Sequence, residues 1–146
     1  GRIEGAGKAF FADGTFYEGN FKNAKQHGMG KIIYNDGHSF NGQWVDGLKQ
    51  GQGLEIQADG STYQGTFIAG RPHGKGKLKL LNGFEYFGDW IDGEISGYGQ
   101  ITYSNGNVYV GNLIQAQPNG LGKMTYISGK IFDGIWDLGK EKKSVE

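Results

Sequence analysis

The chain of 146 residues contains 15 basic and 15 acidic residues, 29 glycines, two prolines and no cysteine. Its formal net charge of zero provides no general field that would attract nucleic acid or an anionic membrane, and the lack of cysteine excludes disulfides and thiolate metal sites. The glycines do not recur every third residue, which excludes collagen, and an aromatic content of 14% is unlike that of a disordered linker.

A 23-residue repeat organises the whole sequence. The stretch Tyr63-Gln-Gly-Thr-Phe67 returns in the same register as similar stretches that begin at Tyr17, Phe40, Tyr86, Tyr109 and Phe132. We number positions 1 to 23 from this leading aromatic residue. We predict one array over 1–146, made of the second half of a repeat (1–16), full repeats at 17–39, 40–62, 63–85, 86–108 and 109–131, the first half of another (132–140), and a charged tail (141–146). Because the chain begins inside a repeat, we expect it to be part of a longer protein.

Each repeat is predicted to be a β-hairpin, because apolar residues and glycines alternate with polar residues at the two-residue period of a strand. In chain order, the predicted strands are 7–11, 17–21, 30–34, 40–44, 53–57, 63–67, 76–80, 86–90, 99–103, 109–113, 122–126 and 132–136. We expect a loop rich in Gly, Asn, Lys and His within each repeat, and a tight turn at dipeptides such as Asp13-Gly14 between repeats. No stretch has a helical period of useful length.

The predicted register pairs position 5 with 14, 3 with 16 and 1 with 18, and then position 18 with position 1 of the next repeat. Most aromatic residues then share one face, and each tryptophan lies against a glycine of the neighbouring strand. The opposite face, with residues such as Glu18, Asn41 and Gln64, is expected to face water. Glycine recurs at positions 3, 12, 14 and 21, and this repetition argues for a backbone role rather than for a single phosphate-binding loop.

Tyr63-Gln-Gly-Thr-Phe, followed by Gly70-Arg-Pro-His-Gly-Lys-Gly76 and then Asn82-Gly83, resembles the MORN (membrane occupation and recognition nexus) repeat. The resemblance implies an all-β fold, namely an elongated, single-layer, twisted antiparallel sheet of consecutive β-hairpins, like a solenoid. It also implies repeats that are non-catalytic, bind partner proteins, in some members self-associate, and were first proposed to bind lipid. Five positions depart from the pattern: Ala24, Gln57, Leu80, Leu113 and Ala116.

We predict that the chain is a scaffolding module that binds an extended or helical segment of a partner protein, in the cytoplasm near membrane or cytoskeleton. A single layer leaves an aromatic face uncovered, and tyrosine and tryptophan are favoured anchors at interfaces. The predicted partner-binding groove consists of Tyr17, Phe21, Tyr34, Phe40, Trp44, Tyr63, Phe67, Tyr86, Trp90, Tyr103 and Tyr109.

Two further interactions are left open. The alternative function is weak binding of phosphoinositide or other anionic lipid through the basic third repeat, by Arg71, His73, Lys75, Lys77 and Lys79. The other is homodimerisation, because an array that ends in an open strand invites pairing with a second copy. The predicted edge residues are Phe132, Ile135 and Trp136, although the charges that follow them would oppose such pairing.

Catalysis, cofactor binding, metal binding and nucleic-acid binding are not expected. The Gly-x-Gly pairs never extend to a dinucleotide-binding or P-loop motif, and no helix is available to bind phosphate. His27 and His73 share position 11 with Gln50, Ser96 and Asn119, which indicates a polar hydrogen-bonding group rather than a base or metal ligand.

Overall fold

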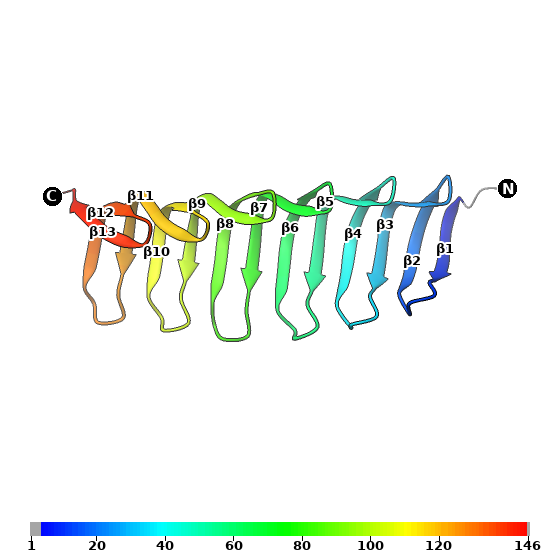
Figure 1. Ribbon diagram of the computed structural model, residues 1–146, viewed down its shortest axis with the longest axis horizontal. Coiled ribbons are helices and arrows are strands. Elements are labelled where there is room, and N and C mark those ends of the chain that lie inside the picture. The colour runs from blue at the N-terminus through cyan, green and yellow to red at the C-terminus, as the bar shows by residue number, and fades with distance from the viewer. Residues whose placement is uncertain (1–3, 146) are drawn as a thin grey trace. The chain divides into compact units, whose positions relative to one another are not determined.

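A computed structural model describes residues 4–145, which form 13 strands and no helix (Figure 1). The chain divides into two compact units, Gly1–Arg71 and Pro72–Glu146. In each unit, every strand pairs antiparallel with the next strand along the chain. The predicted fold class, all-β and built from consecutive antiparallel hairpins in an open sheet, is confirmed.

The first unit contains β1 (Gly5–Phe10), β2 (Phe16–Lys22), β3 (Lys25–Ile33), β4 (Ser39–Val45), β5 (Leu48–Ile56) and β6 (Thr62–Ile68). The second unit contains β7 (Arg71–Lys79, whose first residue ends the first unit), β8 (Glu85–Ile91), β9 (Glu94–Thr102), β10 (Val108–Ile114), β11 (Gln117–Thr125), β12 (Ile131–Asp137) and β13 (Lys140–Ser144).

The predicted strand register is wrong by two residues. Position 1 pairs with position 16, as in Tyr17 with Ile32, and position 3 pairs with position 14, as in Gly19 with Gly30. Between repeats, position 16 again pairs with position 1, as in Ile32 with Phe40. Because successive side chains in a strand point to opposite faces, an even shift leaves every residue on its predicted face.

The turns explain the shift. The segment predicted as a loop within each repeat is strand, and the chain reverses at positions 7 and 8 in a two-residue turn such as Asn23-Ala24, with φ of 52° and 65°. Positive φ at both residues is the geometry of a type I′ hairpin turn. The longer strand then fits its partner through a bulge, in which His27, Gly28 and Met29 lie opposite Asn20.

The Asp-Gly and Asn-Gly dipeptides connect consecutive repeats, as predicted, but through a wider turn. The Phe11 amide donates to the Thr15 carbonyl at 2.8 Å, and the Gly14 amide donates to the Phe11 carbonyl at 3.0 Å. The Asp13 carboxylate accepts a further bond from the Thr15 amide at 2.9 Å, which lowers the pKa of Asp13. This side-chain bond fixes the turn locally.

The core of each repeat is a ring that occupies space left by glycines. Tyr17 is fully buried, and a Cβ added at Gly30 would overlap its phenol group; Phe40 with Gly53, Tyr86 with Gly99 and Tyr109 with Gly122 repeat the arrangement. The tryptophans at position 5 also lie opposite glycines. Trp44 pairs with Gly28, and its indole Nε1–H donates to the Gly30 carbonyl at 3.0 Å.

We predict that Gly30→Ala lowers the free energy of unfolding by about 3 kcal/mol, because the added methyl group displaces the Tyr17 ring from a packed site. Gly7→Ala is the matched control, since Gly7 also occupies position 14 but a Cβ there would meet only the Phe21 ring at 3.3 Å. Urea unfolding followed by tryptophan fluorescence measures both. Equal stability of the two variants would contradict the assignment of Gly30 to the ring slot.

Candidate partner-binding face

The structure brings the predicted groove residues together on one face of each unit but buries most of them. Nine of the eleven side chains are at most 8% exposed: Tyr17, Phe21, Phe40, Trp44, Tyr63, Phe67, Tyr86, Trp90 and Tyr109. Only Tyr34 and Tyr103 are half-buried. The nine rings therefore present little area to a partner, and whether this face binds one stays a prediction.

The rings are buried because they cover one another across repeats. The centroids of Phe40 and Phe67 are 4.9 Å apart with the rings edge to face, and those of Tyr109 and Trp136 are 5.5 Å apart in the same geometry. Edge-to-face contacts at this distance are favourable beyond the area that they bury. The rings of a single layer of strands thus bury one another without a second layer.

The tyrosine hydroxyl groups are satisfied within the same repeat. Tyr63 donates to the Thr66 carbonyl at 2.9 Å, and Tyr109 donates to the Asn112 carbonyl at 2.6 Å. Burial raises the pKa of both tyrosines to about 12. They are therefore neutral donors at physiological pH, which fixes each ring over its glycine slot.

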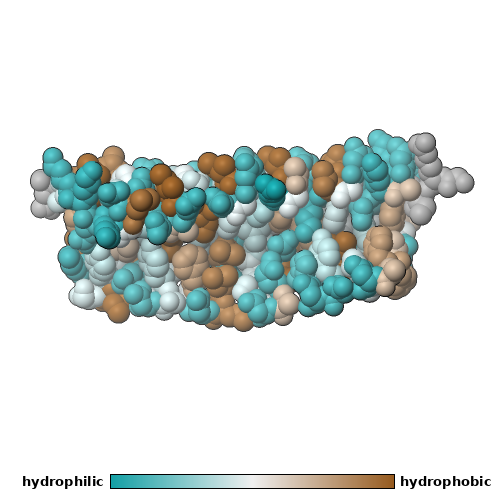
Figure 2. Space-filling view, viewed as in Figure 1, coloured by the Kyte–Doolittle hydropathy of each residue, from teal (hydrophilic) through white to brown (hydrophobic). Residues whose placement is uncertain are grey.

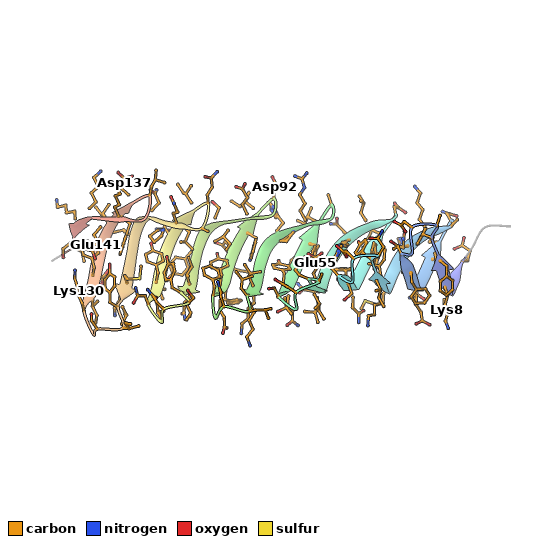
Figure 3. The ribbon with its side chains drawn as sticks, turned by 60° about the horizontal axis from the view of Figure 1, so that its bottom comes forward. Lys8, Glu55, Asp92, Lys130, Asp137 and Glu141 are labelled. Atoms are coloured by element: carbon orange, nitrogen blue, oxygen red, sulfur yellow. The ribbon has the colours of Figure 1, made fainter. Side chains whose placement is uncertain are left out.

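Positions 10 and 16 determine what this face offers to a partner, and sequence reasoning missed them. In the first unit, Lys49 and Glu55 form an ion pair at 3.0 Å, with side chains only 12% and 19% exposed. The Lys49 ammonium also lies 4.9 Å from the centre of the Phe40 ring. Figure 3 shows Glu55 among the side chains of the first unit. The available signal was a Glu at position 16, which in the other repeats holds apolar residues such as Ile101, together with a Lys at position 10 of the same repeat.

In the second unit the same face is apolar and hollowed. The first cavity, of about 480 Å³, is lined by Leu78, Trp90, Gly93, Glu94, Ile95, Gln115 and Ala116. The second cavity, of about 370 Å³, is lined by Tyr103, Asn105, Asn107, Ala116, Gln117, Pro118, Met124, Tyr126, Trp136 and Gly139. Ala116 lines both cavities, and Trp90 and Tyr103 are the predicted groove residues that take part.

The predicted lipid-binding cations lie beside acidic groups. In the second unit, Lys75 forms an ion pair with Asp89, the side chain of Lys77 lies 3.7 Å from that of Glu85, and His73 lies 3.5 Å from the carboxylate of Asp92. The hydrogen bond from Lys75 is the largest cause that lowers the pKa of Asp89. These neighbours reduce the positive charge of the cluster, and lipid binding by Arg71 and the other four residues stays a prediction.

The prediction that Phe132, Ile135 and Trp136 form an open edge is wrong. Their strand, β12, pairs with β11 on one side and with β13 on the other. Residues 141–144 of the predicted charged tail belong to β13, because strand pairing is made by the backbone and accepts charged, solvated side chains; residue 146 of that tail lies outside the described residues. Trp136 is buried, and Ile135 is partly exposed.

The opposite face is not uniformly polar as predicted. In the first unit it carries exposed polar residues such as Asn41 and Gln64 but also exposes more than half of Met29. In the second unit it exposes more than half of Phe87, Tyr98 and Leu121. Hydrophobic side chains also lie among hydrophilic ones along the edge that carries the two-residue turns (Figure 2). Val45, Ile68, Ile91 and Ile114 are the exposed hydrophobic residues that directly precede these turns.

Position 11 acts as predicted, through hydrogen bonding. His73 Nδ1 accepts from the Asp92 amide at 3.2 Å, and the Asn119 side-chain oxygen accepts from the Leu138 amide at 3.1 Å. Each bond ties a strand to the two-residue turn of the next repeat. Within residues 4–145, no three His, Cys, Asp or Glu side chains are placed to hold a metal ion. The described part of the chain has no helix long and apolar enough to cross a membrane.

Comparison with known proteins identifies the family to which these repeats are similar. The model of the MORN repeat matches residues 17–39, 40–62, 63–83, 86–108 and 109–131, which is well over half of the chain. Among solved structures, the TCP domain of SAS-4 (dCPAP) of Drosophila melanogaster, in complex with a proline-rich motif of Ana2 (dSTIL), is similar with a TM-score of 0.57 and 11% sequence identity. The match covers 89% of this chain and 72% of that chain, and at this identity it shows a shared fold alone. No curated protein matches the chain.

We predict that Lys49→Ile lowers the free energy of unfolding by about 3 kcal/mol, because it leaves the Glu55 carboxylate without its partner in a poorly solvated site. Lys49→Ile with Glu55→Ile reproduces the pair that the chain itself uses at Ile95 and Ile101, so stability should return to within about 1 kcal/mol of the original. Urea unfolding of Lys49→Ile, Glu55→Ile and the double variant measures the coupling. A loss in the double variant equal to the sum of the two single losses would show that the pair is not coupled.

Proposed function

The chain belongs to the MORN repeat family, and from this premise we propose that it is a non-catalytic interaction module that binds a segment of a partner protein along the aromatic face of the second unit. The observation that carries the proposal is the pair of cavities that meet at Ala116. Ligand-binding sites are commonly concave and mostly apolar with a few polar groups, and both cavities have this composition.

The fold supports binding without rearrangement. The face is fixed by rings in glycine slots, such as those of Tyr86 and Tyr109, by the indole bond from Trp90 to the Gly76 carbonyl at 3.0 Å, and by bonds between position 11 and the next turn, such as that from the Asp92 amide to His73. A face held in this way loses little conformational entropy when a segment binds. A rigid, repeated face also suits a scaffolding role.

The similar Drosophila structure supports the class of partner. In that structure, a domain with the same fold is in complex with a proline-rich motif. Transfer of this property to the present chain is part of the proposal. A short segment, rather than a folded domain, also suits two cavities of a few hundred cubic ångströms each.

The test is a selection of random twelve-residue peptides, displayed on phage, against the whole chain. We predict that Ala116→Arg weakens binding of the selected peptides at least about tenfold, because the new side chain fills the junction of the two cavities. Ala116 is exposed and lies at a turn with φ of 64°, so a longer side chain there should not disturb the core.

Ala24→Arg is the matched control. Ala24 holds the same turn position in the first unit, with φ of 65°, is also exposed, and lines neither cavity. Peptides that bind both variants equally would show that the cavities are not the binding face. A selection that enriches no peptide would contradict segment binding itself.

A further inference from the structure

We infer that the first unit contains a binding site for a primary alkylammonium group, built from the rings of Tyr34 and Phe40 and the carboxylate of Glu55, and that the chain fills this site with its own Lys49 side chain. The site lies on the aromatic face of the first unit and shares no residue with the two cavities of the second unit. It therefore stands apart from the proposed function.

The repeat at 40–62 differs from the other repeats at two positions of this face. Glu55 occupies position 16, where the other repeats have apolar residues, and Gln57 occupies position 18, where most repeats have a phenylalanine or tyrosine. Gln57 Nε2 donates to Glu55 Oε1 at 2.9 Å, and Lys49 Nζ donates to Glu55 Oε2 at 3.0 Å. Each carboxylate oxygen thus has its own partner, and Gln57 orients the carboxylate independently of Lys49.

Two aromatic rings complete the surroundings of the ammonium group. Lys49 Nζ lies 5.1 Å from the centre of the Tyr34 ring and 4.9 Å from that of the Phe40 ring. Both distances are within the roughly 6 Å over which the face of a ring attracts a cation. The Phe40 ring is held in its glycine slot, and the His38 imidazole stacks on Tyr34 with 3.9 Å between ring centres. The rings are therefore held in place by contacts other than those with Lys49.

Burial makes these contacts strong. The side chains of Lys49 and Glu55 are only 12% and 19% exposed. In the second unit, Lys130 has similar partners, since its Nζ lies 5.4 Å from the centre of the Tyr126 ring and 3.8 Å from the Glu141 carboxylate, but its side chain is 65% exposed. Water screens such exposed contacts, whereas the attraction of a cation to a ring is stronger at a desolvated site. Lys49 thus occupies a true binding site, and Lys130 lies on a surface.

The composition of the site selects its ligand. The rings attract any cation, including a quaternary ammonium ion. Glu55 also accepts an N–H bond, which a primary ammonium group donates and a quaternary one lacks. The site therefore favours a primary alkylammonium, the chemical class of a lysine side chain. A tethered group has an effective concentration in the millimolar range, so Lys49 keeps the site closed to dilute free ligands.

The test removes the Lys49 side chain and supplies the missing group from solution. Lys49→Ala deletes three carbon atoms and the ammonium nitrogen, and propylammonium contains the same atoms. We expect about 100 mM propylammonium chloride to raise the folding equilibrium constant of Lys49→Ala about tenfold over the same concentration of sodium chloride, which corresponds to a dissociation constant of about 10 mM. Urea unfolding of the whole chain, followed by tryptophan fluorescence, measures the effect.

Matched controls isolate the site. Neutral 1-propanol should not stabilise Lys49→Ala, and tetramethylammonium chloride should stabilise it less than propylammonium chloride does, because neither donates an N–H bond to Glu55. Addition of Glu55→Gln to Lys49→Ala should abolish the effect of propylammonium. Lys130→Ala removes an exposed lysine beside a ring and a carboxylate, and propylammonium should leave its stability unchanged.

Equal stability of Lys49→Ala in propylammonium and sodium chloride would overturn the inference. Equal stabilisation of Lys130→Ala, or equal stabilisation by 1-propanol, would show a nonspecific effect and overturn it as well. If Lys49→Ala folds in neither salt, the proton NMR spectrum of the unmodified chain decides. The ε-methylene protons of Lys49 should then lie upfield of those of the exposed Lys75, because of the currents of the two rings, and equal shifts would contradict the site.

Discussion

The structure depends on one packing constraint, which is that a large ring at position 1 needs the space that glycines leave on the neighbouring strands. Tyr17, Phe40, Tyr86 and Tyr109 each occupy a position where a single added methyl group at the facing glycine would overlap the ring. A ring is thus buried within one layer of strands, although single sheets normally require a second layer to cover an apolar face. Glycine weakens a strand by itself, so the packed ring offsets the cost of the strand glycines that face it.

The same constraint separates structural residues from those available for binding. The rings are buried in the core, so the residues that vary between repeats and remain available for binding are those at positions 10 and 16. At positions 10 and 16 the first unit has the Lys49–Glu55 ion pair, whereas the second unit has Pro72 with Leu78, Ile95 with Ile101 and Pro118 with Met124. Repeats of one scaffold thereby present a polar face in one place and hollowed apolar subsites in another, which is how a repeat protein acquires specificity without any change of fold.

Sequence reasoning predicted the fold class, the repeats of residues 17–131 and the face on which the rings lie, because these follow from a two-residue and a 23-residue period. It wrongly expected the opposite face to be uniformly polar. It placed Trp44 against a glycine correctly but missed the register by two residues. The reversal at Asn23-Ala24 carries no Asn-Gly or Asp-Gly signal, but Asp46-Gly47 and Asp92-Gly93 at the same two positions do, and sequence reasoning assigned them to a loop instead of a hairpin turn. It also expected exposed aromatic rings, because contacts between rings of successive repeats depend on how the strands curve. The charged residues of β13 gave no apolar alternation from which a strand could be recognised.

The most direct test of this account is a two-dimensional NOE spectrum that contains the α-protons of Gly53 and the ring protons of Phe40. The account predicts strong cross-peaks between them, since a Cβ added at Gly53 would overlap the Phe40 ring, and no strong cross-peak between any ring and the α-protons of Gly70, which has no ring in its chain neighbours and no other atom within 4 Å of the equivalent position. Resolved Gly53 signals without a cross-peak to Phe40 would contradict the packing of rings into glycine slots.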